Sequence, residues 1–199
     1  MARTSTQTAE KILTTAHGLF MERGYVGVSI NDVVQAAGIS KPSLYYYYAD
    51  KQALYAAVAE RALAQMSDEL VAATAADELP FAVQLTRVIE TIQAHNAEDF
   101  RMMRHELRVH LDAAHQERVG RQFYGAMVAP IHALMARAVA QGHCPGRDAG
   151  ELAMIFFLFV EAFTGPEVMA AQLRFGAPQI ADMFLHGVAT AAPAVGHTV

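Results

Sequence analysis

Apolar and polar residues follow one another with the period of an α-helix through the first fifty positions. One apolar face runs through residues 9–23 and stops before Gly24; its members are Ile12, Leu13, Ala16, Leu19 and Phe20. A shorter face stops before Gly38 and consists of Ile30, Val33, Val34 and Ala37. In the next segment Leu44 and Tyr48 lie four residues apart and share an inward face, and a fourth helix begins near Lys51. The pattern predicts three short helices and a longer fourth one.

The residues between these faces predict how the helices begin and end. Ser29 lies three residues before Asp32, the spacing of a capping box. Gly38 is suited to the left-handed conformation that ends a helix, and Ser40 is suited to cap the next one, whose first turn accepts Pro42. The second and third helices are therefore expected to form a helix-turn-helix.

The third helix carries the chemistry of a nucleic-acid contact. Lys41 and Lys51 place positive charge at the starts of the third and fourth helices, and the hydroxyls of Tyr45, Tyr46 and Tyr47 are donors for phosphate oxygens. A short exposed helix fits the major groove of DNA. Helix-turn-helix units also occur in proteins that never bind DNA, so the pattern alone leaves both alternatives open.

Two stretches, ILTTAHGLFMERGY and SINDVVQAAGISKPSLYYYYADKQALY, resemble the N-terminal DNA-binding domain of TetR-family transcriptional regulators. They run from Ile12 to Tyr55, about a quarter of the chain. The resemblance implies a homodimer that binds double-stranded operator DNA and a helical C-terminal region that binds a small-molecule inducer. It also implies roles for single residues: phosphate contacts by Tyr45, Tyr47 and Lys51, and a groove-facing position for Ser43 and Tyr46.

Two positions depart from the family pattern. Tyr47 stands where the family usually has histidine, which puts one phosphate contact in doubt. Tyr48 stands where phenylalanine is usual, so its hydroxyl near the core costs about 1 to 3 kcal/mol unless it finds a partner.

The rest of the chain shows no sustained alternation and is rich in Ala, Leu, Met, Gln and Arg, so it also predicts helices. Glycine and proline steps divide it, and Pro130 predicts a kink inside one segment. We expect helices near 51–75, 80–95, 97–113, 116–141, 148–164 and 178–190. The prediction is an all-α protein with a DNA-binding domain over residues 1–52 and an effector-binding and dimerisation domain over residues 53–199.

The segment 152–163 is apolar nearly all round, so it must be covered on more than one side. Pairing this helix and the last helix with their copies in a second subunit covers both, as the resemblance also implies; the alternative is that one subunit covers them completely. The expected interface residues are Phe156, Phe159, Phe163, Ile180, Met183, Phe184 and Val188.

The middle helices carry phenylalanine and methionine side chains that form adaptable apolar walls. Most of these belong to an ordinary core, but the resemblance implies that some line a cavity for a lipophilic or aromatic effector. The candidates are Phe81, Leu85, Phe100, Met103, Leu107, Phe123 and Met127.

Composition and charge limit the classes of protein to which this chain can belong. In 199 residues, 53% are hydrophobic and 18% charged, which excludes a disordered or low-complexity chain. The net charge of −5 is unevenly placed: all three lysines lie within the first 52 residues, and nine of the ten phenylalanines lie beyond them. One cysteine cannot close an intrachain disulfide, no secretory leader is visible, and the apolar run 152–160 is too short to cross a membrane, so we expect a cytoplasmic protein.

The sequence gives little support for a metal site or a catalytic site. His95, His105, His110 and His115 are spaced by five or ten residues, which does not stack two imidazoles on one helical face. Glu161 suits either a cationic ligand or an interfacial arginine, and Cys144 beside His143 lacks a fixed activating base. No phosphate-binding, dinucleotide-binding or hydrolase motif occurs, so no metal, cofactor or enzymatic activity is expected. The sequence thus favours a ligand-released repressor; the alternative is a ligand-binding or enzyme-like protein whose helix-turn-helix has no function.

Overall fold

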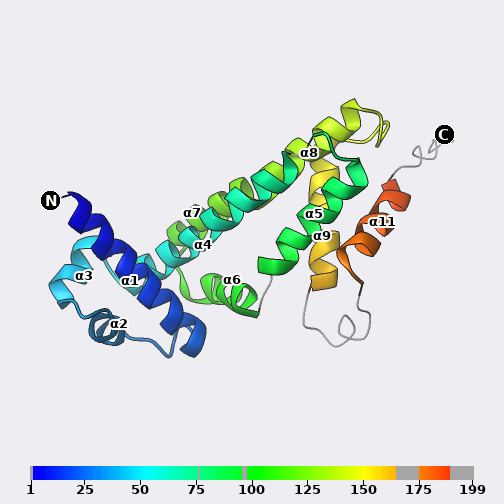
Figure 1. The fold of residues 1–199 in the computed structure, drawn as a ribbon. Coiled ribbons are helices and arrows are strands. Elements are labelled where there is room, and N and C mark those ends of the chain that lie inside the picture. The colour runs from blue at the N-terminus through cyan, green and yellow to red at the C-terminus, as the bar shows by residue number, and fades with distance from the viewer. Residues whose placement is uncertain (1, 76, 96–97, 165–174, 189–199) are drawn as a thin grey trace. The chain divides into compact units, whose positions relative to one another are not determined.

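The computed structural model describes residues 2–75, 77–95, 98–164 and 175–188, and every regular element within them is helical (Figure 1). The N-terminal helices are α1 (Ala2–Arg23), α2 (Ile30–Ala37) and α3 (Lys41–Tyr47). They are followed by α4 (Lys51–Thr74), α5 (Phe81–His95), α6 (Glu98–His110) and α7 (Ala113–Phe123). A π-helical turn (Tyr124–Val128) leads into α8 (Ala129–Ala140), and α9 (Ala149–Thr164) and α11 (Ala177–Val188) complete the described helices. The predicted all-α class is confirmed for these residues.

The expected segment 116–141 differs most from its prediction, because it is divided into α7, the π-helical turn and α8. The turn ends at Val128, two residues before Pro130, which occupies the first turn of α8. Proline has no N–H group and its ring crowds the carbonyl four residues earlier, so regular α-helical bonding cannot continue through this point. A π-helical turn accommodates the change in hydrogen bonding.

The chain divides into two compact units. The first combines Met1–Gln65 with Ala97–Phe123, and the second combines Met66–Asn96 with Tyr124–Val199. In the first unit Ile12, Ala16 and Phe20 on α1 and Val33 and Ala37 on α2 are buried, as predicted. The other members of the two predicted faces are half-buried: Leu13, Leu19, Ile30 and Val34. The assignment of separate functions to residues 1–52 and 53–199 stays a prediction.

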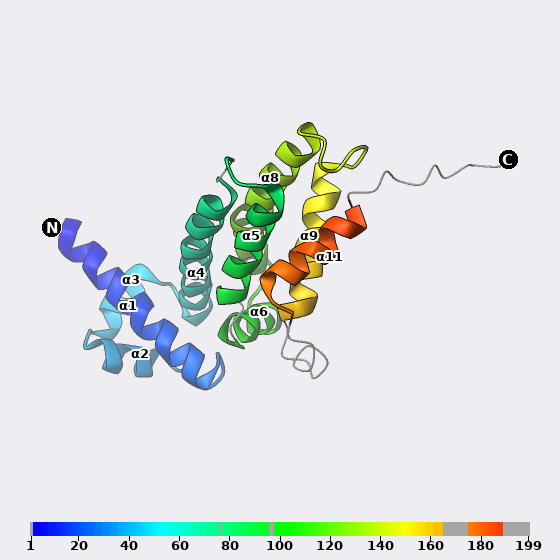
Figure 2. The same ribbon diagram turned by 45° about the vertical axis from the view of Figure 1, so that its right-hand side comes forward.

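Within the second unit α11 lies against α5 and α9, and α8 lies against α9 (Figure 2). The ring of Phe156 on α9 meets the ring of Phe184 on α11 edge to face, with 4.8 Å between their centroids. Both rings and the side chain of Ile180 are buried. The core of this unit therefore includes the contact between α9 and α11 within one subunit, together with buried side chains of α5 and α8.

This packing corrects part of the expected subunit interface. Phe156, Ile180 and Phe184 are buried inside one copy and are not available to a second copy. Phe159 and Phe163 are half-buried, Met183 is exposed, and the side chain of Val188 lies outside the described residues. The apolar side chains that α9 does expose are Met154, Ile155 and Leu158. A helix that is apolar all round offers no periodicity to indicate which side faces its own subunit, so the sequence alone could not separate Phe156 from the exposed residues of α9. Which residues a second copy contacts stays a prediction.

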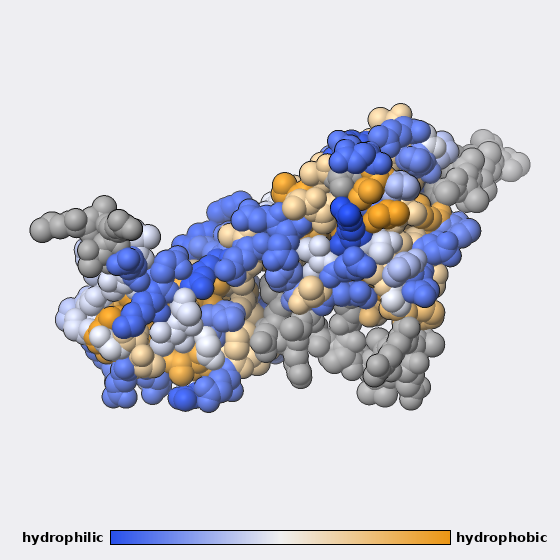
Figure 3. Space-filling model, in the orientation of Figure 1, coloured by the Kyte–Doolittle hydropathy of each residue, from blue (hydrophilic) through white to orange (hydrophobic). Residues whose placement is uncertain are grey.

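On the face drawn in Figure 3, hydrophilic residues predominate and hydrophobic residues reach the surface in places in both units. One helical stretch among the described residues, Ala113–Ala140, is long and apolar enough to span a membrane by length and composition alone. Its most apolar part is 44% buried inside the protein, and the core helix of a soluble protein passes the same test.

Candidate nucleic-acid interface

The start of α2 is fixed by the capping box that the sequence predicts. The Ser29 hydroxyl oxygen accepts the Asp32 N–H at 3.2 Å, and the Asp32 carboxylate accepts the Ser29 N–H at 2.7 Å and its hydroxyl at 2.6 Å. These hydrogen bonds to Ser29 lower the pKa of Asp32, so the carboxylate stays ionised and the cap persists at neutral pH.

The turn between α2 and α3 also forms as expected. Gly38 adopts a φ of 60°, in the left-handed region, and the N–H of Ile39 donates to the Val34 carbonyl at 3.2 Å. Ser40 then caps α3 by accepting the N–H of Ser43 at 3.3 Å. The helix-turn-helix is therefore locally determined, because each of its bends has its own hydrogen bonds.

The third helix is anchored by a single buried residue. Leu44 is fully buried, whereas Lys41 and Pro42 are exposed, and the exposed fractions of Tyr45 and Tyr46 are 44% and 79%. Ser43 and Tyr47 are half-buried. The face that Leu44 leaves free thus carries one cation and two aromatic hydroxyls, a set of donors suited to phosphate oxygens.

Tyr48 lies differently from its prediction. α3 ends at Tyr47, and Tyr48 continues in extended conformation with φ −134° and ψ 117°. Its side chain is half-buried, not on the inward face of the helix with Leu44, and this burial raises its pKa. The prediction extended the helix to Tyr48, one residue further than the chain forms it. Asp50 then caps α4 by accepting the N–H of Ala53.

Lys51, the first residue of α4, is held by an aromatic ring. Its ammonium nitrogen lies 4.1 Å from the ring centroid of Tyr25, within the range of a cation–π contact. Tyr25 in turn stacks on His110 of α6, with 5.0 Å between the ring centroids. Burial lowers the pKa of Lys51 and the nearby carboxylate of Glu106 opposes this change. The position of this lysine therefore depends on a residue that follows α1 and on one from α6.

Glu106 is the functional candidate that sequence reasoning missed. One of its carboxylate oxygens accepts the backbone N–H of Tyr25 at 2.8 Å, and the other accepts the hydroxyl of the buried Tyr55 at 2.7 Å. Gly24 leaves room for this approach, because a Cβ there would lie 2.8 Å from the carboxylate. Burial and the bond to Glu106 raise the pKa of Tyr55, which keeps the phenol neutral. The partners lie 81 and 51 residues away in the chain, so no local pattern predicts them.

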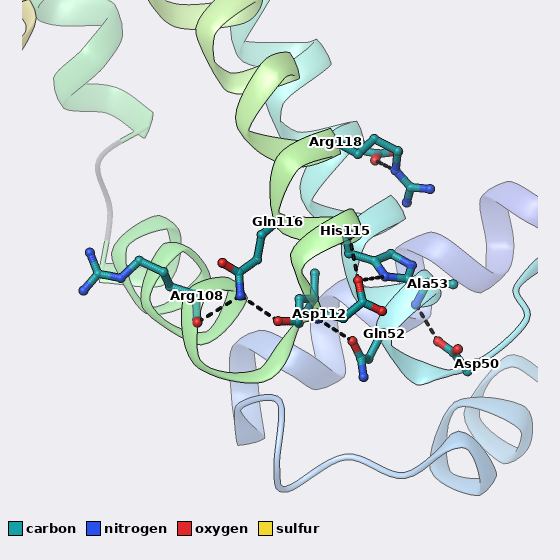
Figure 4. Close-up of polar contacts among 10 residues, drawn as sticks. Asp50, Gln52, Ala53, Arg108, Asp112, His115, Gln116 and Arg118 are labelled. Atoms are coloured by element: carbon teal, nitrogen blue, oxygen red, sulfur yellow. Dashed lines mark hydrogen bonds and ion pairs between the residues drawn. The ribbon is translucent and has the colours of Figure 1, made fainter.

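A second junction joins the start of α4 to the corner between α6 and α7 (Figure 4). The side-chain oxygen of Gln52 accepts the N–H of Asp112 at 2.8 Å, and Asp112 caps α7 by accepting the N–H of His115 at 2.9 Å. The amide of Gln116 donates to the carbonyls of Arg108 and Leu111, which fixes the end of α6 against α7. Glu106 therefore connects α6 to the segment before α2 and to α4, and Gln52 connects α4 to the corner between α6 and α7. These contacts lie on both sides of the helix-turn-helix in the chain.

A hollow of about 240 Å³ lies between α4, α6 and α7 within the first unit. Its lining contains three of the expected effector residues: Met103, Leu107 and Phe123. The structure does not bring the others to it, because Phe81, Leu85 and Met127 are buried within the second unit. The side chain of Phe100 lies outside the described residues.

The histidines, the cysteine and the glutamate that the sequence offered as metal-binding, catalytic or ligand-binding residues have different surroundings. Among the described residues no group of three potential metal ligands comes together. His95 lies 2.7 Å from Glu69, His115 lies 2.9 Å from Asp112, and His105 is exposed. Cys144 is buried, which raises the pKa of its thiol, and Glu161 is half-buried.

Residues 12–58 match the model of the bacterial regulatory proteins of the tetR family. Over 46 residues the chain is 41% identical to the biofilm operon icaADBC HTH-type negative transcriptional regulator IcaR of Staphylococcus epidermidis. That match covers 23% of this chain and 25% of IcaR, so the chain spans about a quarter of the length of this relative.

Solved structures resemble the chain over a greater length. A putative TetR-family transcriptional regulator from Mesorhizobium loti superposes with a TM-score of 0.73 at 20% identity, covering 94% of this chain and 98% of that one. The transcriptional regulator FadR from Bacillus subtilis, in complex with stearoyl-CoA, gives a TM-score of 0.71 at 13% identity, covering 92% and 99%. At these identities the likeness shows the fold.

Proposed function

We propose that this chain, whose N-terminal helix-turn-helix domain belongs to the TetR family, is a transcriptional repressor that binds palindromic operator DNA as a homodimer. One observation carries the proposal: α3 is anchored by Leu44 alone and turns Lys41, Tyr45 and Tyr46 to solvent. Exposing two neighbouring tyrosines has no benefit for folding, whereas both rings and both hydroxyls are useful against sugars and phosphates.

The proposed contacts divide into positioning and sequence-reading ones. Lys41, Lys51, Tyr45 and Tyr47 contact phosphates, while Ser43 and Tyr46 face the bases of the major groove. Tyr46 suits this role because 79% of it is exposed to solvent. Tyr47 contacts the ring of Tyr46 edge to face at 5.0 Å, so the two side chains support each other.

A second copy of the chain covers the exposed apolar side of α9 in this proposal. The exposed fractions of Ile155 and Leu158 are 53% and 59%, and Met154 lies on the same helix at 41%. Such a cluster is unfavourable in water and is typical of a surface that another molecule covers. A two-fold dimer also supplies the two reading helices that a palindromic operator needs.

The hollow in the first unit is the proposed effector site. Met103 and Leu107 line it from α6, and Glu106 lies between them on the same helix. A ligand that displaces α6 shifts the carboxylate that holds Tyr25 and Tyr55, and with Tyr25 the ring beneath Lys51. Because linkage is reciprocal, the ligand lowers operator affinity by the same factor by which operator DNA lowers ligand affinity.

The proposed location is the cytoplasm, where the chromosome of a bacterium is accessible, and we propose no catalytic role. The competing function is a helical ligand-binding or enzyme-like protein that retains the N-terminal helices only as structure. The exposure of Tyr45 and Tyr46 favours the regulator, since a purely structural α3 gains nothing from two solvated rings.

A fluorescence anisotropy titration with the DNA that flanks the gene tests the proposal. Lys51→Ala and Tyr45→Phe are expected to weaken binding to all DNA sequences, each by roughly 1 kcal/mol, and the lysine change lowers the slope of log affinity against log salt by about one. Arg87→Ala, which removes an exposed cation from α5, is the control and leaves affinity and slope unchanged. Unaltered operator affinity in both test variants would contradict the proposed contacts.

A further inference from the structure

We propose that the hollow between α4, α6 and α7 takes a small amphipathic carboxylate, with its apolar part inside and its anionic group against Arg108. The inference rests on the proposed function, because it names the chemical class of the effector. Two features of the lining support it: the inner side chains are buried and apolar, and two exposed arginines line the hollow.

The inner wall of the hollow is apolar. Ala59 and Leu63 contribute from α4, Met103 from α6 and Val119 from α7, and none of these residues is more than 5% exposed. Leu107 and Phe123 complete the apolar lining. A wall of this kind stabilises a hydrocarbon group by removing it from water. The uncharged polar side chain of the lining is Gln116, whose amide already donates to the carbonyls of Arg108 and Leu111.

The opening is cationic. Arg104 and Arg108 both line the hollow, both are exposed, and their spacing of four residues places them on one side of α6. Within the described part of the chain the guanidinium of Arg108 makes no hydrogen bond or ion pair, and Figure 4 shows it extending away from α7. The lining residues themselves include no carboxylate.

Three acidic side chains on the same helices already have partners. Glu60 of α4 pairs with Arg118 at 2.5 Å, Glu117 pairs with Arg121, and Glu106 is bound to Tyr25 and Tyr55. None of them neutralises Arg108 in the structure. A ligand carboxylate is therefore favoured at the opening, and a ligand ammonium group is disfavoured by like charge.

The volume limits the size of the apolar part. A methylene group occupies roughly the liquid volume of a water molecule, about 30 Å³, so a hollow of about 240 Å³ holds a chain of about eight carbons. Gly120 adds to this room, because a Cβ built there meets nothing within 4 Å. Octanoate is therefore a matched probe of both the volume and the charge.

The first experiment is isothermal titration of the full-length protein with octanoate, octan-1-ol and octylamine at millimolar concentration and neutral pH. Octanoate is expected to bind, octan-1-ol to bind at least about threefold more weakly, and octylamine not to bind. Arg108→Gln is expected to reduce octanoate affinity to that of octan-1-ol, while Arg121→Gln, on α7 outside the lining, leaves it unchanged. Absence of octanoate binding, or tighter binding of octylamine, would overturn the proposal.

The second experiment fills the hollow. Gly120→Leu places a side chain in the open space of the lining and is expected to abolish binding of octanoate and octan-1-ol alike. Gly18→Leu is the matched control, because Gly18 also lies in a helix, its Cβ would also meet nothing within 4 Å, and it does not line the hollow. Octanoate binding that survives Gly120→Leu would show that the ligand binds elsewhere, which refutes the site.

These outcomes remain separable from the proposed function. Operator affinity is measured without any ligand, so a failure to bind DNA refutes the regulator and leaves the octanoate site standing. DNA binding by a protein that prefers octylamine refutes the ligand class alone.

Discussion

Removing the hydroxyl of Tyr55 tests the junction between α4, α6 and the segment after α1. Tyr55 is fully buried, and its hydroxyl donates to a Glu106 oxygen at 2.7 Å. Phenylalanine keeps the ring and its edge-to-face contacts with Phe20 and Tyr25, whose centroids lie 4.7 and 5.0 Å away. The substitution therefore removes one hydrogen bond and leaves the apolar packing in place.

The expected loss follows from the kind of bond that is removed. A hydrogen bond to a charged group contributes about 1.5 to 3 kcal/mol to the free energy of unfolding. Glu106 retains the N–H of Tyr25, so its charge is not left without a donor, and we expect Tyr55→Phe to cost about 2 kcal/mol. In a chain of this size that loss lowers the Tm by roughly 4 to 8 °C.

Urea unfolding followed by circular dichroism measures this loss, at a fixed protein concentration because a dimer unfolds in a concentration-dependent way. Tyr45→Phe is the control, since it deletes the same atom from an exposed tyrosine and is expected to change stability by less than about 0.5 kcal/mol. Combining Tyr55→Phe with Glu106→Gln is expected to cost less than the sum of the single changes. If Tyr55→Phe matches the parent protein within about 0.5 kcal/mol, the reasoning about this junction is wrong.

Three further results are expected. Burial raises the pKa of Tyr25, Tyr48 and Tyr55, so the folded state favours the neutral phenols. Their contribution to the free energy of unfolding is complete below the ordinary tyrosine pKa of 10.0 and is lost as the pH rises above that value. Unfolding titrations are expected to show that loss, and a Tyr55→Phe protein with an equally steep decline would contradict the assignment to Tyr55. Leu158 is 59% exposed, and Leu158→Glu is expected to yield folded monomers in analytical ultracentrifugation, because burying the new charge against a second copy would cost about 3 kcal/mol or more. The control is Val109→Glu, at a residue that is 58% exposed on α6, and this variant is expected to stay dimeric. A dimeric Leu158→Glu protein would exclude this side of α9 as the interface. Gly24→Ala is expected to destabilise the protein, because it strains a residue at φ 69° and brings a Cβ to 2.8 Å from Glu106; an unchanged urea midpoint would show that the loop yields without loss.

The helix-turn-helix could be predicted from the sequence because its determinants are local. Ser29 and Asp32 act on each other across three residues, and Gly38 and Ser40 act on the turn in which they lie. Helical spacing alone indicates that Leu44 faces inward, and Leu44 is fully buried. Each of these interactions joins residues that are close together in the chain. The local sequence is therefore sufficient to predict the local structure.

The other features depend on contacts between distant segments. Glu106 on α6 gives the sequence no sign of its partners Tyr25 and Tyr55, and the hollow exists only because α4, α6 and α7 come together. On α9 the sequence was uninformative for a different reason. Phe156 and Leu158 belong to an unbroken apolar run, and only the packing of α11 against the Phe156 ring shows which side is inward.

Footprinting of the DNA that flanks the gene tests the central claim most directly. The account predicts protection by the full-length protein of two half-sites related by two-fold symmetry, centred about 34 to 36 Å apart or a multiple of that spacing. Leu158→Glu is expected to abolish the paired protection, since it separates the two reading helices. Protection of a single site by the parent protein, or none that survives excess unrelated DNA, would contradict the account.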